Sequence, residues 1–212
     1  MSKRVCVIVS GGEYCALPGE LRSADYVIAC DKGWQYAERL GLRPDWIVGD
    51  FDSSPLPEMD AAVTRVPTRK DDTDTMLAAR RALELGYRDV AVVCAFGGRL
   101  DHTLANLQTA AFLVAHGARA RLVGADTDAL AFTGGTERVP RRDGYSLSVF
   151  ALSDRCTGVT LRGTKYECEN ETLTNAFPLG VSNVWDASEA EIAVESGILL
   201  VLQSRLTPWE HI

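Results

Sequence analysis

The feature that most constrains the fold is an alternation of short, wholly apolar segments with helical segments up to about residue 130. The apolar segments lack alternating polar residues, which predicts strands that are buried on both faces. Such strands, separated by helices, are typical of a mostly parallel sheet with helices on both faces. Strands are expected at residues 5–9, 26–30, 46–48, 62–66, 90–94 and 120–123, and helices at residues 33–40, 73–85 and 101–116.

The later two helices are predicted from apolar residues that recur at intervals of three and four. A glycine follows each predicted helix, at a position where glycine commonly ends one. In the helix at 73–85 the apolar residues are Met76, Ala79 and Leu83. In the helix at 101–116 they are Leu100, Leu104, Leu107, Ala111 and Val114.

After about residue 130 the pattern changes to short segments of alternating polarity that are separated by turn residues. These segments lie at residues 145–150, 158–161, 172–175, 191–195 and 198–203, and none has the period of a helix. We therefore expect two domains, an α/β domain at residues 1–130 and a smaller antiparallel β domain at residues 131–212.

Composition excludes several classes of protein. The net charge of −7 argues against a nucleic-acid-binding surface, because such a surface needs a basic face. No apolar run is long enough to cross a membrane, and the run after the N-terminus is too short for a signal peptide. The six cysteines have no Cys-x-x-Cys spacing, which favours buried thiols in a reducing compartment over a zinc site. A cytoplasmic protein is expected, without nucleic-acid or membrane partners.

Two carboxylates, Asp50 and Asp52, follow the apolar segment at residues 46–48. In extended backbone they point to the same side. At a separation of about 4 Å and an effective dielectric constant near 20, they repel each other by roughly 4 kcal/mol. A divalent cation such as Mg²⁺ would offset this repulsion. The alternative is a solvated acidic turn in which Ser53 caps a short helix.

Polar clusters at the carboxyl ends of predicted strands strengthen the case for a site, because open α/β sheets bind ligands there. They lie at residues 29–33, 49–53, 68–74 and 96–102. Arg99 and Lys70 can bind phosphate oxygens, and Gly97-Gly98 allows backbone to approach a ligand closely. The candidate metal ligands are Asp50, Asp52, Asp71, Asp74 and Asp101.

Structural alternatives exist for several of these residues. Asp101 could be only the N-cap of the helix at 101–116, and Asp72 is the favoured N-cap of the helix at 73–85. Lys70 could simply neutralise the acidic loop. His102 could order the helix start or contact a nucleotide. Residues 10–12, Ser-Gly-Gly, are a weak phosphate-loop candidate for which a tight turn is favoured, since neither a Walker A nor a Gly-x-Gly-x-x-Gly motif is present.

At these residues the chain resembles the thiamine pyrophosphokinase (thiamine diphosphokinase) family. The matching motifs are LRPDWIVGDFDS at 42–53, KDDTD at 70–74, GGRLDHTLAN at 97–106, TGVTLRGTKY at 157–166, LGVSN at 179–183 and VESG at 194–197. The resemblance implies transfer of pyrophosphate from ATP to the hydroxyl group of thiamine, giving thiamine diphosphate and AMP. It also implies an α/β nucleotide domain followed by a β-sandwich domain, and a homodimer with thiamine bound at the interface.

Carried over by position, the resemblance implies that the five aspartates hold Mg²⁺ and the polyphosphate, with Arg99 on a phosphate. Asp31, Gly33, Lys70, Gly97, Gly98 and His102 would lie on the ATP side, and Ser182 and Asn183 would bind thiamine. One departure concerns the ATP side: the family commonly has Asp-Gly-Gly-Ala-Asn where this chain has Asp31-Lys32-Gly33-Trp34-Gln35. Lys32 either adds a charge near phosphate or points to solvent.

Two other functions remain as alternatives. The first is a pyrophosphokinase for another hydroxymethyl heterocycle, such as a pterin, against which the thiamine-like second domain argues. The second is a non-catalytic sensor of thiamine or a nucleotide, which would not need the five aspartates and Arg99.

Overall fold

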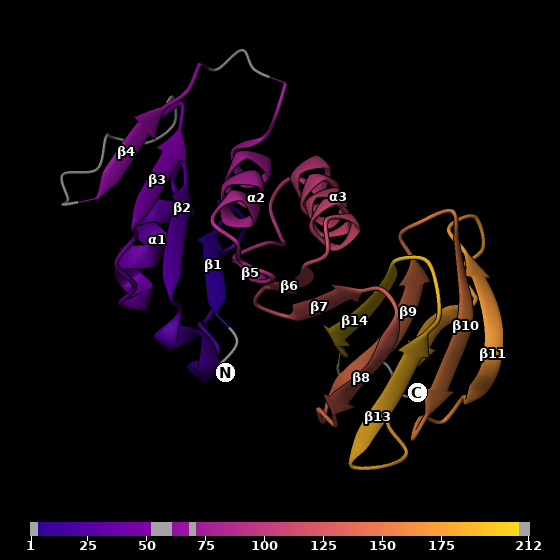
Figure 1. The fold of residues 1–212 in the computed structure, drawn as a ribbon. Coiled ribbons are helices and arrows are strands. Elements are labelled where there is room, and N and C mark those ends of the chain that lie inside the picture. Colours follow the sequence, from indigo (N-terminus) through magenta and orange to yellow (C-terminus); the bar gives the residue numbers. More distant parts are fainter. Residues whose placement is uncertain (1–3, 52–60, 68–70, 208–212) are drawn as a thin grey trace. The chain divides into compact units, whose positions relative to one another are not determined.

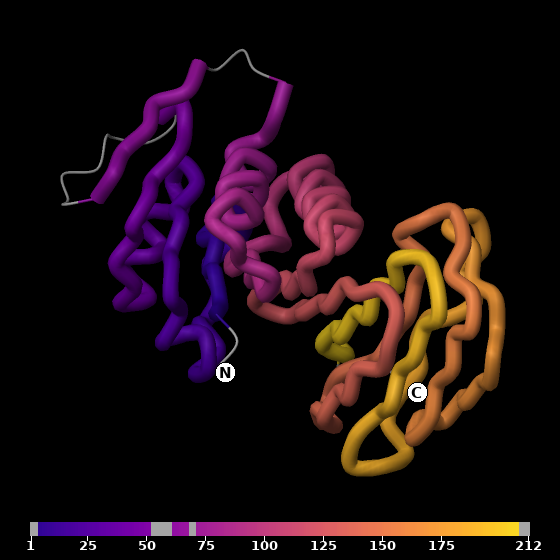
Figure 2. The backbone as a smooth tube through the Cα atoms, viewed as in Figure 1, coloured from indigo at the N-terminus to yellow at the C-terminus, as the bar shows by residue number. Residues whose placement is uncertain are grey.

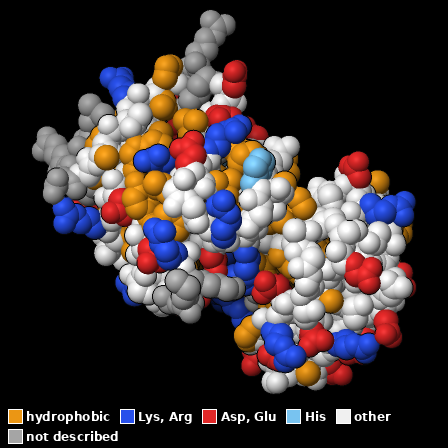
Figure 3. Space-filling model, viewed as in Figure 1, with side chains coloured by type: hydrophobic (Ala, Val, Ile, Leu, Met, Phe, Trp, Pro, Cys, Tyr) orange, Lys and Arg blue, Asp and Glu red, His pale blue; other side chains and the backbone are white. Residues whose placement is uncertain are grey.

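A computed structural model describes residues 4–51, 61–67 and 71–207 of the chain, so the predicted ligands Asp52 and Lys70 lie outside the described residues. The chain divides into two compact units, residues 1–125 and residues 126–212, which are considered separately. None of the helices described combines the length and the apolar character needed to cross a membrane. On the face seen in Figure 3, acidic and basic side chains are interspersed.

The described part of unit 1 contains a six-stranded parallel sheet in the order β6-β5-β1-β2-β3-β4 (Figure 1). The interior strands are mostly apolar, and Ile8, Ile28 and Val92 are fully buried at its centre. The parallel sheet predicted from the sequence is confirmed. Its strands are β1 (Val5–Val9), β2 (Tyr26–Cys30), β3 (Trp46–Gly49), β4 (Ala62–Arg65), β5 (Asp89–Val93) and β6 (Arg119–Val123).

Helices cover both faces of this sheet. Val7 and Val9 of β1 belong to the same apolar cluster as Ala37 and Leu40 of α1 (Gly33–Leu40). Ser10 instead bonds to α2 (Asp74–Glu84) on the other face. Helix α3 (Leu100–Ala115) runs beside α2 in the ribbon and in the backbone trace (Figure 2), and a short 3-10 helix, η1, spans Gly19–Ser23.

The buried face of α3 differs from the leucine face that the spacing suggests. Leu100 and Leu104 are 73% and 54% exposed, whereas Asn106, Thr109 and Leu113 are buried. The helix is therefore predicted correctly, and its buried side includes Val114 but not the first two leucines. The polar residues are tolerated inside because Asn106 and Thr109 both hydrogen-bond to backbone carbonyl groups.

Unit 2 consists of two antiparallel sheets whose inner faces share one apolar core, so it is a β-sandwich as expected. Leu147 and Leu199 come from one sheet, and Val159 and Ile192 from the other. One sheet has the order β12 (Gly180–Asn183), β9 (Tyr145–Ala151), β14 (Leu199–Arg205) and β7 (Thr127–Phe132). The other has the order β11 (Cys168–Thr174), β10 (Arg155–Arg162), β13 (Glu189–Val194) and β8 (Gly135–Pro140).

All six cysteines are free thiols, and only Cys168 is not fully buried. Burial raises the pKa of the Cys6 thiol to about 12. These thiols therefore behave as small apolar groups in the interior, as the sequence suggests.

Candidate functional site

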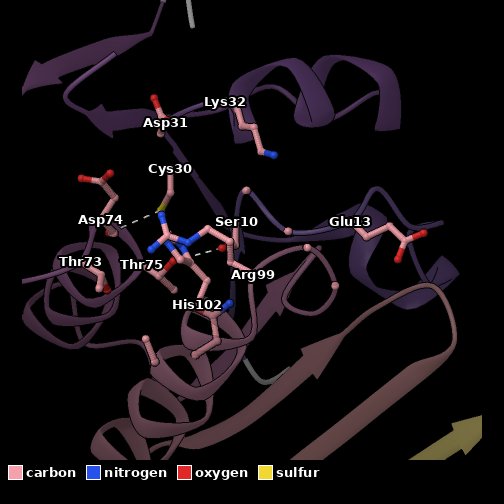
Figure 4. A pocket seen from close by; sticks show the side chains of 16 residues that line it. Ser10, Glu13, Cys30, Asp31, Lys32, Thr73, Asp74, Thr75, Arg99 and His102 are labelled. Carbon is pink, nitrogen blue, oxygen red and sulfur yellow. Dashed lines mark hydrogen bonds between the residues drawn. The ribbon is translucent and has the colours of Figure 1, made fainter. Parts of the chain in front are cut away.

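A cavity of about 590 Å³ opens in unit 1 at the carboxyl ends of β1, β2 and β5 (Figure 4). Its wall comes from the turns that follow these three strands and from the first turns of α2 and α3. This is where an open α/β sheet binds its ligands. The predicted site residues that line it are Asp31, Asp74, Gly97, Gly98, Arg99 and His102.

The buried wall of the cavity is neutral and hydrogen-bonded. The hydroxyl oxygens of Ser10 and Thr75 lie 3.1 Å apart, and both residues are buried. The Cys30 thiol donates to the carbonyl oxygen of Asp74 at 3.5 Å. Burial raises the pKa of Cys30 well above its usual range, so it is a thiol and not a nucleophilic thiolate. These contacts hold the start of α2 against β1 and β2.

Backbone packs against backbone at Gly12. Its N–H donates to the carbonyl oxygen of Cys94 at 3.0 Å. A Cβ atom at Gly12 would lie 2.4 Å from the carbonyl oxygens of both Cys94 and Phe96, so no side chain fits there. The turn after β1 and the turn after β5 therefore meet through main chain, which leaves the cavity open above them.

Three acidic residues line the cavity, namely Glu13, Asp31 and Asp74. Asp31 joins β2 to α1 with φ 45°, a left-handed conformation that an aspartate adopts at some cost. Asp74 is the first residue of α2. In the view of Figure 4, Asp31 lies above Cys30, Asp74 lies to its left, and Lys32 lies to its upper right.

Of the other predicted carboxylates that the structure describes, Asp50, Asp71 and Asp101 are not among the lining residues. Asp50 follows β3 and is half-buried, and Asp71 is exposed. Among the residues that the structure describes, no group of three or more histidine, cysteine or acidic residues is arranged to hold a metal ion. Gly33 begins α1 beside the cavity, where a Cβ atom would lie 2.2 Å from the carbonyl oxygen of Val9.

Arg99 enters the cavity from the start of α3 and is bound to Asp101. Its Nε and Nη2 donate to the two carboxylate oxygens of Asp101 at 3.1 and 2.5 Å. These bonds raise the pKa of Arg99 and lower the pKa of Asp101. Asp101 also accepts the backbone N–H of His102. It lies in the first turn of α3 and is not its N-cap, since the N-cap is Arg99.

Helix α2 is capped by Thr73, and not by Asp72 as the sequence analysis favours. The Thr73 hydroxyl oxygen accepts the backbone N–H of Met76 at 3.1 Å. Asp72 lies one residue too early for this role and accepts a hydrogen bond from Arg80 at 2.9 Å. The helix begins at Asp74, one residue later than the apolar spacing suggests.

Replacement of Thr73 by alanine is expected to lower the free energy of unfolding by about 1 kcal/mol, because an N-cap acceptor is lost. Asp72→Ala removes only an exposed ion pair and should change it by less than about 0.5 kcal/mol. Urea unfolding of both variants measures the difference. A larger loss for Asp72→Ala than for Thr73→Ala would contradict the assignment of the cap.

Several cavity residues have no role predicted from the sequence, among them Glu13, Thr75 and Asn106. Asn106 is buried, and its side-chain amide donates to the carbonyl oxygen of Ala95 at 2.7 Å, which ties α3 to the turn after β5. The available signal was an asparagine one turn after His102 on the same helix. Glu13 gives no such signal, because its position depends on the path of the turn after β1.

In unit 2 the two predicted thiamine-binding residues have different surroundings. Asn183 is buried, and its amide both accepts from and donates to the backbone of Tyr166, at 3.0 and 2.7 Å. Ser182 is exposed, with φ 59°. A second cavity of about 300 Å³ lies beside Asn183. Trp185 is buried and donates to the carbonyl oxygen of Val139, so it packs in the core.

Both units match models of one protein family. Residues 17–122 match "Thiamin pyrophosphokinase, catalytic domain", and residues 137–199 match "Thiamin pyrophosphokinase, vitamin B1 binding domain". The chain belongs to the thiamine pyrophosphokinase family. It is 28% identical over 207 residues to the thiamine pyrophosphokinase of Bacillus subtilis (strain 168), which covers 93% of this chain and 97% of that protein.

Solved structures agree with the family assignment. The crystal structure of the Bacillus subtilis thiamine pyrophosphokinase has a TM-score of 0.81 at 26% identity, covering 96% of this chain and all of the other. That of the Geobacillus thermodenitrificans thiamin pyrophosphokinase has a TM-score of 0.77 at 26% identity, covering 96% and 99% of the two chains. The protein is thus an enzyme of the thiamine diphosphokinase class.

The two family matches divide the site residues. The catalytic-domain match of the thiamine pyrophosphokinase family includes all the cavity lining from Cys30 to Asn106, but not the turn at residues 10–13. The vitamin B1 binding match includes Ser182, Asn183 and the cavity beside them.

Proposed function

We propose that this chain transfers pyrophosphate from ATP to the hydroxyl group of thiamine, producing thiamine diphosphate and AMP, with Mg²⁺ as the cofactor. The observation that carries the proposal is the cavity of unit 1, which brings Asp31 and Asp74 together with Arg99 at the carboxyl edge of the sheet. Unit 1 would then be the catalytic domain, and unit 2 the thiamine-binding and dimerisation domain.

Arg99 and the turn before it would bind the polyphosphate of ATP. The guanidinium group can donate two parallel hydrogen bonds to phosphate oxygens, as it does to Asp101. Gly97 and Gly98, with φ of 82° and 69°, let the backbone approach a ligand closely, and the N–H groups at the start of α3 favour an anion. His102 lies on the first turn of α3 and would contact the nucleotide.

The donor chemistry of the cavity fits Mg²⁺. This ion commonly uses one or two carboxylates together with substrate phosphates, so a cluster of three protein ligands is not required. Asp31 and Asp74 are the aspartates among the lining residues, and Asp50, Asp52, Asp71 and Asp101 complete the proposed acidic set. When bound, the ion would neutralise negative charge on the phosphates during transfer.

In the proposed reaction the thiamine hydroxyl oxygen forms a bond to the β-phosphorus of ATP. The bond from that phosphorus to the oxygen bridging it to the α-phosphorus breaks, and AMP leaves with the electron pair. The hydroxyl proton passes to one of the carboxylates of the site. The role of the chain is to align the two reactants and to place positive charge around the transferred group.

Thiamine would bind through Ser182 and Asn183 of a partner subunit in a homodimer. Large apolar side chains are exposed on α3 in unit 1 and around Ser182 in unit 2, and such exposed apolar groups support the proposed interface between subunits. On α3 these are Leu100 and Leu104, and beside Ser182 they are Phe177, Leu179 and Val181, all between 47% and 73% exposed. The free thiols of the chain agree with a cytoplasmic location, which is reducing.

The deciding experiment incubates the purified chain with Mg-ATP and thiamine and follows AMP and thiamine diphosphate. Equimolar formation of both, abolished by a chelator, is the expected result. Hydroxymethylpterin replaces thiamine in a parallel reaction. AMP formed only with the pterin would favour the other pyrophosphokinase, and binding of thiamine and Mg-ATP without AMP would favour a sensor.

A further inference from the structure

Lys32 extends into the cavity of unit 1, across the turn that follows β1. It lines the cavity, and in Figure 4 its side chain lies on the opposite side of Cys30 from Asp74. A Cβ atom at Gly11 would lie 3.2 Å from Cε and 3.4 Å from Cγ of Lys32, so the side-chain stem rests on this glycine. The half-buried Lys32 side chain therefore packs against the turn after β1 and lines the cavity.

The ammonium group of Lys32 has no carboxylate partner within the described part of the chain. Its recorded contact is with the ring of Tyr36, 5.8 Å from Nζ to the ring centroid. Arg99, by contrast, is held by Asp101. Lys32 therefore brings to the cavity a positive charge that forms no direct ion pair with the residues that the structure describes.

Lys32 also occupies a helix position that disfavours a cation. It is the N-cap of α1, and its side chain makes no capping hydrogen bond. Arg99 is in the same situation at the N-cap of α3. The N-terminus of a helix carries partial positive charge, so a cation there is unfavourable unless an anion binds. Thr73, at the third helix start facing the cavity, is an ordinary cap followed by Asp74.

Lys32 and Arg99 thus line one cavity, each as the N-cap of a helix and each without a capping hydrogen bond from its side chain. They lie on turns that follow different strands. We infer that Lys32 is a second polyphosphate contact and that the nucleotide phosphates bind between Lys32 and Arg99. This inference rests on the proposed function and extends its ATP site. It assigns a substrate contact to the position where the family commonly has glycine.

The matched variant is Lys32→Met, which keeps a side-chain stem over Gly11 and removes the charge. The probe is α,β-methylene-ATP with Mg²⁺, which cannot undergo the transfer, titrated by calorimetry. A hydrogen bond to a charged group is worth enough that its loss should weaken binding roughly 10- to 100-fold. Lys32→Arg should bind within about threefold of the wild type, and thiamine affinity should not change in either variant.

Arg39→Met is the control, because it removes one charge from the exposed side of the same helix, where Arg39 stacks on Tyr14. Analogue binding by Lys32→Met within twofold of the wild type would overturn the inference. So would an equal weakening by Arg39→Met, since that would be a general charge effect. Circular dichroism confirms that each variant is folded.

The titration separates this inference from the proposed function, because binding of the analogue does not require turnover. A wild type that binds the analogue through Lys32 but forms no AMP would overturn the proposed function alone. A wild type that forms AMP while Lys32→Met binds normally would overturn the inference alone. Failure of the wild type to bind the analogue would overturn both.

Discussion

Asp74→Asn is expected to lower the rate of AMP formation by roughly 100- to 1,000-fold, the loss that follows removal of one preorganised charged group from an active site. Asp74 is the carboxylate that the start of α2 brings to the cavity. Asparagine has nearly the same shape and leaves the cap at Thr73 in place. The loss of a negative charge from the first turn should cost only about 0.3–1 kcal/mol of stability.

Asp72→Asn is the matched control for this variant. It makes the same chemical change two residues earlier, at a carboxylate that bonds to Arg80 and does not line the cavity. Steady-state assays with Mg-ATP and thiamine should give near wild-type rates for Asp72→Asn. Normal turnover by Asp74→Asn, or an equal loss in both variants, would remove Asp74 from the catalytic set.

The parallel sheet could be predicted because β1 is apolar throughout and β5 is apolar after Asp89, as expected of strands that are covered on both faces. The strands β7, β8 and β12 give weaker signals. β8 exposes most of its residues and lies between turn-like sequences, and β12 has only four residues. Whether a short or exposed segment forms a strand depends on the strands it pairs with, so its own sequence gives little indication that it is a strand.

The arrangement of the site depends on strand order, which the local sequence does not contain. Residues 10–13 line the cavity because β1 lies between β2 and β5, so that the turns after all three strands meet. Taken alone, Ser10-Gly11-Gly12 resembles any tight turn. The motif residues Asp31, Asp74 and Arg99 could be found because each follows a strand or begins a helix at the carboxyl edge of the sheet.

The leucines of α3 show that helical spacing does not by itself reveal which side of a helix is buried. Their spacing indicates a helix, but Leu100 and Leu104 are exposed while Asn106 is buried. Hydropathy alone would place the leucines inside. Asn106 is buried instead, and its side-chain amide donates a hydrogen bond to the carbonyl oxygen of Ala95 beside the cavity. This bond offsets the cost of burying a polar side chain. The exposed leucines are then available for the proposed dimer interface.

Gly33→Ala is expected to lower the free energy of unfolding by about 3 kcal/mol, the upper part of the usual range for overpacking a rigid interior. Gly33 is the first residue of α1 and is buried against the end of β1. An added Cβ atom would lie 2.2 Å from the carbonyl oxygen of Val9 and 3.1 Å from that of Ser10. Both neighbours are backbone at the sheet edge, so the start of the helix must move away.

Gly19→Ala is the control, because a Cβ atom there meets nothing within 4 Å and the backbone is not left-handed. It should change stability by less than about 0.5 kcal/mol, as measured by urea unfolding. Gly33→Ala should also weaken binding of the ATP analogue at temperatures where it is still folded, because Asp31 and Lys32 directly precede Gly33. A Gly33→Ala variant as stable as Gly19→Ala would mean that α1 can shift freely, and Lys32 would then not be held in place by the packing of its own helix.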